Sequence, residues 1–210
     1  MRLSLFTKWN LALAALLAGS GCVGGFGGGT PAFREPGFRA TSVRRPALLV
    51  RVSVPAELSR RERERIPEDY GAAVVEGLER LGVLAVDMAS VPGTAARPLE
   101  GLDRPAALRR AREAGAEQIV IIDARLSNGD LTHCKHSGRA RSGSTTFWDV
   151  GLEIRRVPDG QPLLVEPPAE DLRAVDVELD CKTGRLIRRK SMDELITDSV
   201  GLVLAPFSPR

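Results

Sequence analysis

The sequence predicts an α/β fold of the α+β type, with a mixed sheet built in β-α-β-α-β order, then an antiparallel meander and a C-terminal helix. Three observations predict it. Residues 119–122 are four consecutive β-branched residues, typical of a central strand buried on both faces. Residues 145–156 alternate between apolar and polar, typical of a strand with one solvated face. Residues 67–81 repeat their apolar positions with helical spacing.

The first half of the chain supplies the first strand and helix. Residues 47–54 contain many β-branched residues and alternate between apolar and polar at their end, which predicts a strand. Pro55 ends this strand. The charged run 59–65 is expected to be a solvated loop or an early helical turn. Pro67 is expected to stand in the first turn of the helix, since proline suits that position, and Gly82 to end it. The residues predicted to share its buried face are Tyr70, Val74, Leu78 and Leu81.

A second strand and helix follow. Residues 83–86 predict a short strand, and residues 90–102 a loop rich in proline and glycine. Asp103 is expected to cap a helix over 105–114. Residues 118–126 then form the central strand, and the polar residues 127–143 a loop.

The second half is expected to be mainly antiparallel. In residues 145–156 the alternation predicts two faces, with Trp148, Val150, Leu152 and Ile154 on one and Asp149, Glu153 and Arg155 on the other. A turn at 158–160 leads to a short return strand at 163–165. Residues 175–181 alternate as a further strand, which 182–184 turn back into 185–189 as a hairpin. Ser191 and Glu194 form the capping box of the last helix, and Pro206 ends it.

Composition excludes several classes of protein. The chain has 210 residues, of which 43% are hydrophobic and 27% charged, and these are ordinary values for a globular domain. The net charge is +3, from 30 basic and 27 acidic residues. Removing residues 1–21 takes away Arg2 and Lys8, which leaves 28 basic against 27 acidic residues. Nucleic acid is therefore not an expected partner.

The N-terminus predicts export. Arg2 and Lys8 precede an apolar run at 11–18, too short to span a bilayer, and small residues follow it. Residues 1–21 are therefore interpreted as a signal peptide. Cys22 directly follows the small residues and resembles the lipid-modified cysteine of bacterial lipoproteins, although Gly19 stands where these usually have leucine. The alternatives are ordinary signal cleavage with an incidental Cys22, and an anchor that is not cleaved.

The resemblance to lipoproteins implies a place in the cell envelope. Cys22 would become the N-terminus and carry acyl chains such as palmitate, which anchor the chain in the membrane. Val23 after the cysteine implies the outer membrane. Residues 22–46, rich in glycine and proline, are expected to be a flexible tether, and residues 47–210 a single domain facing the periplasm or the cell surface. Phe26, Phe33 and Phe38 of the tether could dock on that domain, insert into lipid or contact a partner.

Three short motifs carry a further resemblance. They are Leu81-Gly82-Val83, residues 114–118 leading into 119–122, and residues 182–187. In this order they resemble envelope lipoproteins related to LpoB, to CsgG and to the N-terminal domain of TolB, over residues 47–205. The resemblance implies a small domain of helices against a mixed sheet, and roles as activators, secretion pores or scaffolds.

Cys134 and Cys181 are the two cysteines that remain after Cys22. In an exported protein such a pair predicts a disulfide, which would stabilise by about 4 kcal/mol on the chain-entropy model. The alternative is a metal site, because Asp130, His133, Cys134 and His136 lie within seven residues. Their spacing matches no standard site, so no metal or other cofactor is expected.

Catalytic motifs are not evident in the sequence. Ser142 and Ser144 do not lie in the Gly-x-Ser-x-Gly pattern of hydrolases, and the glycine run 24–29 follows no strand. We therefore expect a protein that is not an enzyme and that binds another envelope component through a sheet edge or the basic loop 127–143. The alternative is a periplasmic module that binds a small ligand or a metal.

Overall fold

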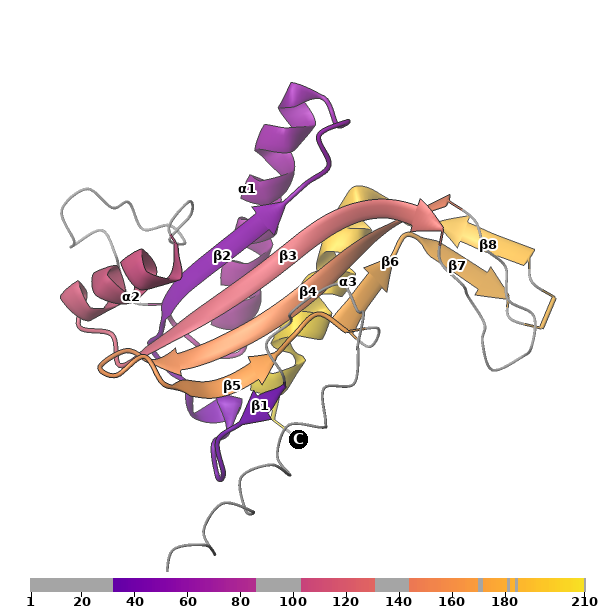
Figure 1. Cartoon of the computed structure of the whole chain (residues 1–210). Coiled ribbons are helices and arrows are strands. Elements are labelled where there is room, and N and C mark those ends of the chain that lie inside the picture. The colour runs from indigo at the N-terminus through magenta and orange to yellow at the C-terminus, as the bar shows by residue number, and fades with distance from the viewer. Residues whose placement is uncertain are drawn as a thin grey trace, which may run out of the picture.

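The computed structural model describes residues 32–85, 103–130, 144–169, 172–180, 182–183 and 185–209. It has the predicted α+β class, with a mixed sheet, a small antiparallel hairpin and three α-helices (Figure 1). The strands are β1 (Phe33–Arg34), β2 (Ala47–Ser53), β3 (Gln118–Asp130), β4 (Ser144–Arg156), β5 (Pro162–Glu166), β6 (Arg173–Val175), β7 (Val177–Asp180) and β8 (Arg185–Arg189). The helices are α1 (Arg60–Arg80), α2 (Arg104–Glu113) and α3 (Met192–Leu204), with short 3-10 turns η1 (Ala40–Ser42) and η5 (Ala205–Phe207).

The main sheet has the order β1-β5-β4-β3-β2, and β6 also pairs with β4. The β2–β3 pair is parallel, and the other pairs are antiparallel. The central position predicted for residues 118–126 is confirmed, because β3 lies between β2 and β4 and Ile119 to Ile122 are all buried. Register along β3 and β4 is continuous from the Gln118–Arg156 pair to the Asp130–Ser144 pair.

Strand β3 extends four residues beyond its predicted end. Residues 127–130 were expected to be loop because they are polar, but they continue the ladder with β4. Polar cross-strand bonds replace apolar packing there: Thr146 Oγ1 donates to Asn128 Oδ1 at 2.9 Å, and Thr145 Oγ1 donates to the Gly129 carbonyl at 3.1 Å.

The prediction of a strand at 83–86 is wrong over the described residues 83–85. The N–H of Val83 donates to the Leu78 carbonyl, and the N–H of Leu84 to the Arg44 carbonyl. Val83 is buried against the end of α1, and Gly82 has a φ of +73°, as helix-ending glycines do. The apolar run therefore closes α1 and adds no strand to the sheet.

Helix α1 begins seven residues before the predicted start at Pro67. Ser59 accepts from the Glu62 N–H, and the Glu62 side chain accepts from the Ser59 N–H, so the charged run 60–65 is helical. Pro67 lies inside the helix and leaves the Arg63 carbonyl without its helical donor. Arg63 is exposed, so water can satisfy that carbonyl.

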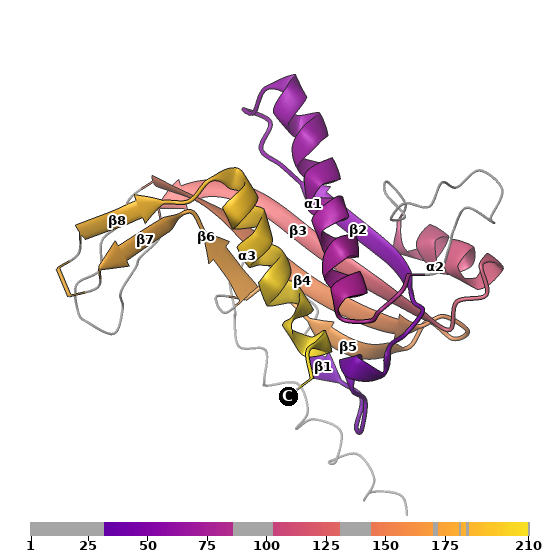
Figure 2. The ribbon, with the colours of Figure 1, turned by 180° about the vertical axis from the view of Figure 1, so that it is seen from behind.

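Helices α1 and α3 cover one face of the sheet and enclose the larger hydrophobic core (Figure 2). Trp148 and Tyr70 lie at its centre, with ring centroids 4.7 Å apart. The predicted inward face of β4 is confirmed, since Trp148, Val150, Leu152 and Ile154 all belong to this core. Helix α2 covers only one end of the opposite face, where Ala107 and Ala111 pack on Leu49, Ile119 and Ile121. Among the described residues, no helix is long and apolar enough to cross a membrane.

The folded part of the chain begins before residue 47. Residues 22–46 were expected to be tether, but β1 pairs with β5, and the Glu35 N–H donates to the Leu163 carbonyl at 2.9 Å. Ala40 and Val43 are buried, and Phe38 packs against the larger core. The spaced prolines of this segment therefore shape a docked chain. Phe26 and the signal peptide, 1–21, lie outside the described residues.

The strand predicted at 175–181 is split at Asp176. Val175 pairs with Phe147 in the main sheet, whereas Val177 begins the separate β7–β8 hairpin. Asp176 is buried and holds the junction: its Oδ1 accepts from the Thr146 N–H and its Oδ2 from Arg189, both at 3.0 Å. The predicted hairpin and the Ser191–Glu194 capping box of the last helix are both confirmed.

Candidate functional site

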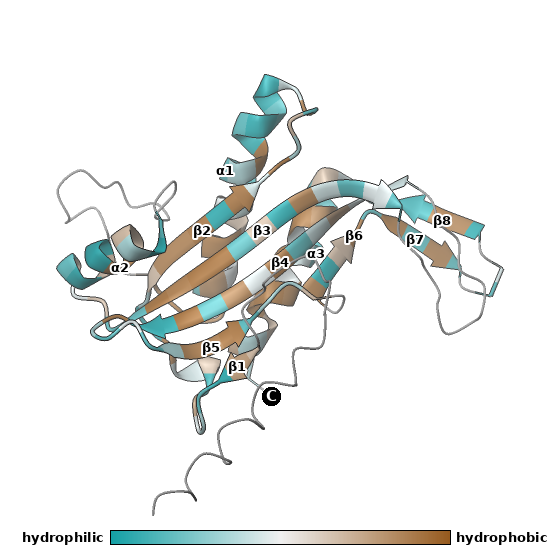
Figure 3. Ribbon diagram, in the orientation of Figure 1, coloured by the Kyte–Doolittle hydropathy of each residue, from teal (hydrophilic) through white to brown (hydrophobic). Residues whose placement is uncertain are grey.

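The candidate site is the part of the sheet face opposite α1 and α3 that α2 leaves uncovered. We call it the open face. It is formed by the outward side chains of Arg51, Ser53, Asp123, Arg125, Ser127, Phe147, Asp149 and Arg173. Along β3, residues from Ile119 to Ile122 are buried, and polar residues then alternate with buried Ala124 and Leu126 (Figure 3). The first half of β3 is therefore buried on both faces, and its second half contributes side chains to the open face.

Arg51 and Asp123 form the pair nearest to α2. They are register partners on β2 and β3, and the guanidinium donates twice: Nε to Oδ1 at 2.5 Å and Nη2 to Oδ2 at 2.6 Å. The hydrogen bonds from Arg51 to Asp123 raise the pKa of the guanidinium above its ordinary value. Both side chains are more than one-third exposed, so the pair fixes the orientation of two charges and adds little stability.

A row of register partners crosses the open face over four strands. Ser53 faces Arg125, Arg125 faces Asp149, and Asp149 faces Arg173. Arg173 Nε donates to Asp149 Oδ1 at 2.6 Å, and its guanidinium lies 4.8 Å from the centre of the Phe147 ring. The row therefore presents a fixed sequence of hydroxyl, cation, anion and cation.

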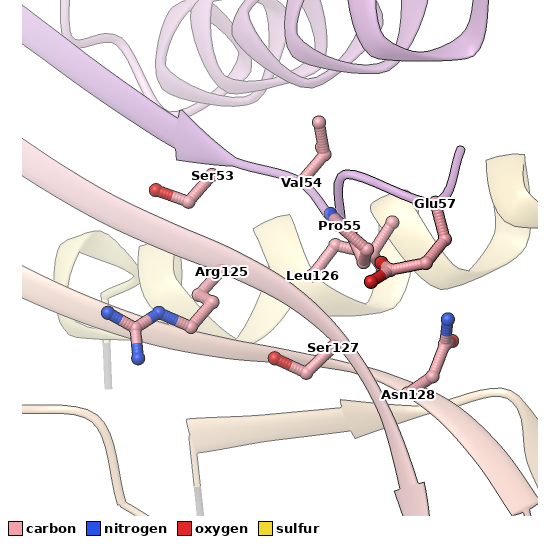
Figure 4. A pocket seen from close by; sticks show the side chains of 8 residues that line it. All are labelled: Ser53, Val54, Pro55, Glu57, Arg125, Leu126, Ser127 and Asn128. Atoms are coloured by element: carbon pink, nitrogen blue, oxygen red, sulfur yellow. The ribbon is translucent and has the colours of Figure 1, made fainter. Parts of the chain in front are cut away.

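A hollow of about 510 Å³ lies beside Arg125. Ser53 and the segment after β2 form one wall, and the far half of β3 forms the other (Figure 4). Arg125 is exposed and makes no hydrogen bond or ion pair with another described residue, unlike Arg51 and Arg173. The hollow is lined by Ser53, Val54, Pro55, Glu57, Arg125, Leu126, Ser127 and Asn128.

The border between α2 and the open face is closed by Glu153. This carboxylate is only 6% exposed and forms ion pairs with Arg104, at 2.7 Å, and with Arg155. The segment after β5 crosses the sheet nearby, since a Cβ atom at Gly151 would lie 3.0 Å from Pro168 Cδ. The predicted shared face of Asp149, Glu153 and Arg155 is confirmed, and ion pairs with arginines occupy both carboxylates.

Tyr70 is the described group with a large pKa shift in the core. Burial raises the pKa of its hydroxyl to about 12, and a hydrogen bond of 3.0 Å with Ser199 partly opposes that rise. It packs on Trp148 and belongs to the structural core. The shift therefore has a packing cause.

The predicted site cysteines and histidines lie outside the described residues: Cys22, Cys134, Cys181, His133 and His136. Of the sequence cluster around them, Asp130 ends β3 and is exposed. Within the described ranges, no three histidine, cysteine, aspartate or glutamate residues are close enough to hold a metal ion.

Sequence reasoning missed the arginines of the open face. The alternation places Asp149 on a polar face, but its register partners Arg125 and Arg173 come from other strands. The available signal was the polar alternation after residue 122, Asp123-Ala124-Arg125-Leu126-Ser127.

No protein-family model matches the sequence, and no curated protein matches it. Among solved structures, a PelC dodecamer from Paraburkholderia phytofirmans is similar with a TM-score of 0.42 and 14% identity, over 87% of this chain and 99% of that chain. A putative neuraminyllactose-binding hemagglutinin homolog from Helicobacter pylori is similar with a TM-score of 0.33 and 10% identity, over 78% and 86%. A hypothetical protein from Chlamydia trachomatis has a TM-score of 0.34 and 11% identity, over 76% and 99%. None of these TM-scores reaches 0.5, so none bears on what this chain binds.

Proposed function

We propose that this chain is a lipid-anchored protein of the bacterial cell envelope, and that it binds another envelope component through the open face without catalysing a reaction. The observation that carries the proposal is the row Ser53, Arg125, Asp149 and Arg173 beside the hollow at Arg125. Helices cover the other face of the sheet, so this face is a large polar surface that the described part of the chain leaves uncovered.

The fixed charges of the open face are better suited to recognising a partner than to stabilising the fold. Exposed ion pairs typically contribute about 0–1 kcal/mol to folding. The same charges, held by strand register, can match complementary charges on a partner and exclude partners that lack them. Arg125 adds a cation that forms no ion pair with another described residue, so it is available to an anionic group of the partner.

The anchor in this proposal is the Cys22 side chain. Cys22 precedes the first described residue, Ala32, by ten positions, which span at most about 35 Å when fully extended. This is shorter than the tether expected from sequence, because β1 is already paired with β5. The domain would therefore work close to the membrane surface.

A photo-crosslinking residue placed at Ser53 in living cells tests the binding role. We expect one discrete crosslinked product, which disappears when Arg125→Glu is added. Glu79, exposed near the end of α1, is the matched control position and should give no such product. If Ser53 crosslinks nothing, or if its product survives Arg125→Glu, the open face is not the binding surface.

The alternative function is a periplasmic module for a small ligand or a metal, and the hollow at Arg125 is the observation that favours it. A small anion such as citrate would then raise the melting temperature of the purified chain, and Arg125→Ala would abolish the rise. Absence of a rise with anions and with divalent metals would leave binding to a macromolecule as the supported function.

A further inference from the structure

The β7–β8 hairpin is separate from the main sheet. It forms a two-stranded sheet that projects beyond the far end of β3 and β4 (Figures 1 and 2). Among the described strands β8 pairs only with β7, so its other edge is open. An isolated two-stranded hairpin is marginally stable, and an open edge is a template for a further strand.

The hairpin is held firmly at its base. The N–H of Asp176 donates to the Thr146 carbonyl at 2.9 Å, and the N–H of Lys190 donates to the Asp176 carbonyl at 2.7 Å. Arg189 also reaches the Ser144 carbonyl at 3.3 Å. The open edge is therefore presented in a fixed direction from the end of β4.

The sequence of β8 is basic and apolar. It reads Arg185-Leu186-Ile187-Arg188-Arg189 and contains no acidic residue. All five residues are exposed, and Leu186 and Ile187 are 46% and 59% exposed. Two large aliphatic residues exposed side by side on a projecting strand can provide apolar contacts for a partner.

The two faces of the hairpin differ. Leu179 pairs with Leu186, and Glu178 pairs with Arg188, so the leucines lie on one face and the charges on the other. The register shifts between these two pairs, which makes Ile187 the extra residue of a β-bulge. Arg188 bonds Glu178 at 3.0 Å and Glu194 at 2.5 Å, which ties the charged face to the start of α3.

Arg185 is the basic residue of β8 that the hairpin does not use. Arg188 and Arg189 each bond carboxylates, but the Arg185 side chain makes no ion pair or hydrogen bond with another described residue. It stands at the hairpin tip, next to Leu186. A partner could therefore neutralise Arg185 without breaking an existing bond.

We propose that the open edge of β8 receives an extended acidic segment of a partner protein, which adds to the hairpin as a third strand. Main-chain bonds would supply affinity, the arginines would select acidic side chains, and Leu186 and Ile187 would receive apolar ones. This proposal goes beyond the proposed function, since it concerns a different surface and does not need the open face.

Charge disfavours a second copy of the chain as the occupant. Two β8 strands paired antiparallel would place arginines opposite arginines, which is destabilising. Strands β2 and β7 also have an edge that no described strand occupies. β2 carries Arg51 and is basic too. β7 carries Glu178 and Asp180, but these carboxylates already accept hydrogen bonds from Arg188 and Thr183. An acidic segment of a partner protein therefore matches β8 in charge without giving up bonds within this chain.

Fluorescence anisotropy with a labelled peptide, acetyl-(Glu-Val)₅-amide, and the full chain tests the proposal. We expect saturable binding that weakens as salt is added. The matched peptides are acetyl-(Lys-Val)₅-amide and an acidic peptide with proline at alternate positions, which lacks the N–H groups of a strand. Neither should bind. Hydrogen exchange should slow at residues 185–190 when the acidic peptide is added.

Two charge reversals separate this surface from the rest of the molecule. Arg185→Glu should weaken binding about three- to tenfold, since it places like charges on neighbouring strands. Arg61→Glu, on the exposed start of α1, and Arg125→Glu, on the open face, should leave peptide affinity unchanged. Failure of the peptide thus leaves the proposed function standing, and failure of the Ser53 crosslink leaves this proposal standing.

Several results would overturn the proposal: no binding of the acidic peptide, equal binding of the lysine peptide, no effect of Arg185→Glu, or slowed exchange only outside 185–190. Vesicles containing phosphatidylglycerol provide the remaining contrast. If the chain binds them in a manner that Arg185→Glu abolishes while the acidic peptide does not bind, the hairpin contacts membrane lipid and not a polypeptide.

Discussion

Gly77 of α1 lies directly against Leu204 of α3: a Cβ atom at Gly77 would come within 2.6 Å of Leu204 Cδ1 and 3.3 Å of Val200 Cγ1. The two helices can approach this closely because position 77 has no side chain. Leu204 is 4% exposed and Val200 is 5% exposed, so neither can move into solvent to relieve a clash.

Gly77→Leu should therefore destabilise the domain by about 2–3 kcal/mol through overpacking. Gly201→Ala is the matched control, because it lies on α3 with nothing within 4 Å of an added Cβ. It should stabilise by about 0.5–1 kcal/mol, since alanine is the better helix former. Urea unfolding of both variants measures the difference. Equal effects at the two positions would contradict the close approach.

Tyr70→Phe should destabilise by about 1–2 kcal/mol, because it leaves the Ser199 hydroxyl buried without its partner. Adding Ser199→Ala should recover much of that loss, since neither polar group then remains unpaired. A double-mutant cycle from urea unfolding measures the coupling. Additive effects of the two substitutions would show that the hydroxyls do not interact.

Alkaline pH should destabilise the wild-type domain through Tyr70. Burial raises its pKa to about 12 in the folded state, above the ordinary value of 10. The resulting stability is fully present below pH 10 and is lost as the pH rises toward 12, because the unfolded state releases the proton first. Tyr70→Phe should flatten the stability curve between pH 10 and 12, and an unchanged slope would contradict the assignment.

Glu194 should make the stability of the structure fall at acidic pH. Hydrogen bonds from Arg188 and from the Ser191 N–H lower its pKa to about 2, from an ordinary value of 4.5. Its contribution to stability is present above pH 4.5 and is lost as the pH falls toward 2. Carboxyl NMR titration should show this low pKa, and Arg188→Ala should raise it. A Glu194 that titrates near 4.5 in the wild-type chain would exclude the bond to Arg188.

Arg125→Gln should leave folding unchanged within about 0.5 kcal/mol, because the side chain is exposed and forms no ion pair with a described residue. Arg173→Gln should cost more, since it removes the ion-pair partner of Asp149, which is 20% exposed. Thermal unfolding of the two variants measures the contrast. A large loss at Arg125 would give it a structural role in place of the proposed binding role.

The mass of the chain purified from bacterial envelopes should correspond to a start at Cys22 plus acyl chains, and Cys22→Ser should remove the lipid. Cys134 and Cys181 should react with an alkylating reagent only after reduction. If both thiols react without reduction, the predicted disulfide is wrong. Metal analysis of the wild-type and His133→Ala/His136→Ala chains would then test the alternative site.

The fold was predictable where local signals decide it. A capping box marks the start of α3, and a run of β-branched residues marks the buried part of β3. The start of α1 was not predicted, because the expected start rested on Pro67, a residue that suits a first turn. Ser59 and Glu62 nevertheless have the spacing of a capping box, so the local signal is present in the sequence.

The candidate site was less predictable because it depends on register between strands distant in sequence. Asp149 is 24 residues from its partner Arg173, and Arg51 is 72 residues from Asp123. A single sequence gives the face of each strand but not which strand lies beside it. The pairing of β1 with β5 was not predicted either, because a strand of two residues is too short to show a sequence pattern.

That pairing gives the chain a mechanical property if Cys22 is the anchor. Any pull between the membrane and the domain acts first on β1, which pairs with β5 over two residues and is flanked by the ion pairs Arg34–Glu166 and Glu35–Arg156. Peeling β1 and η1 away would release the chain up to β2, 25 residues after Cys22, and lengthen the maximum span from about 35 Å to about 85 Å. The segment between Cys22 and β2 would therefore lengthen under force, while the rest of the sheet, with its open face, and the basic hairpin stay folded.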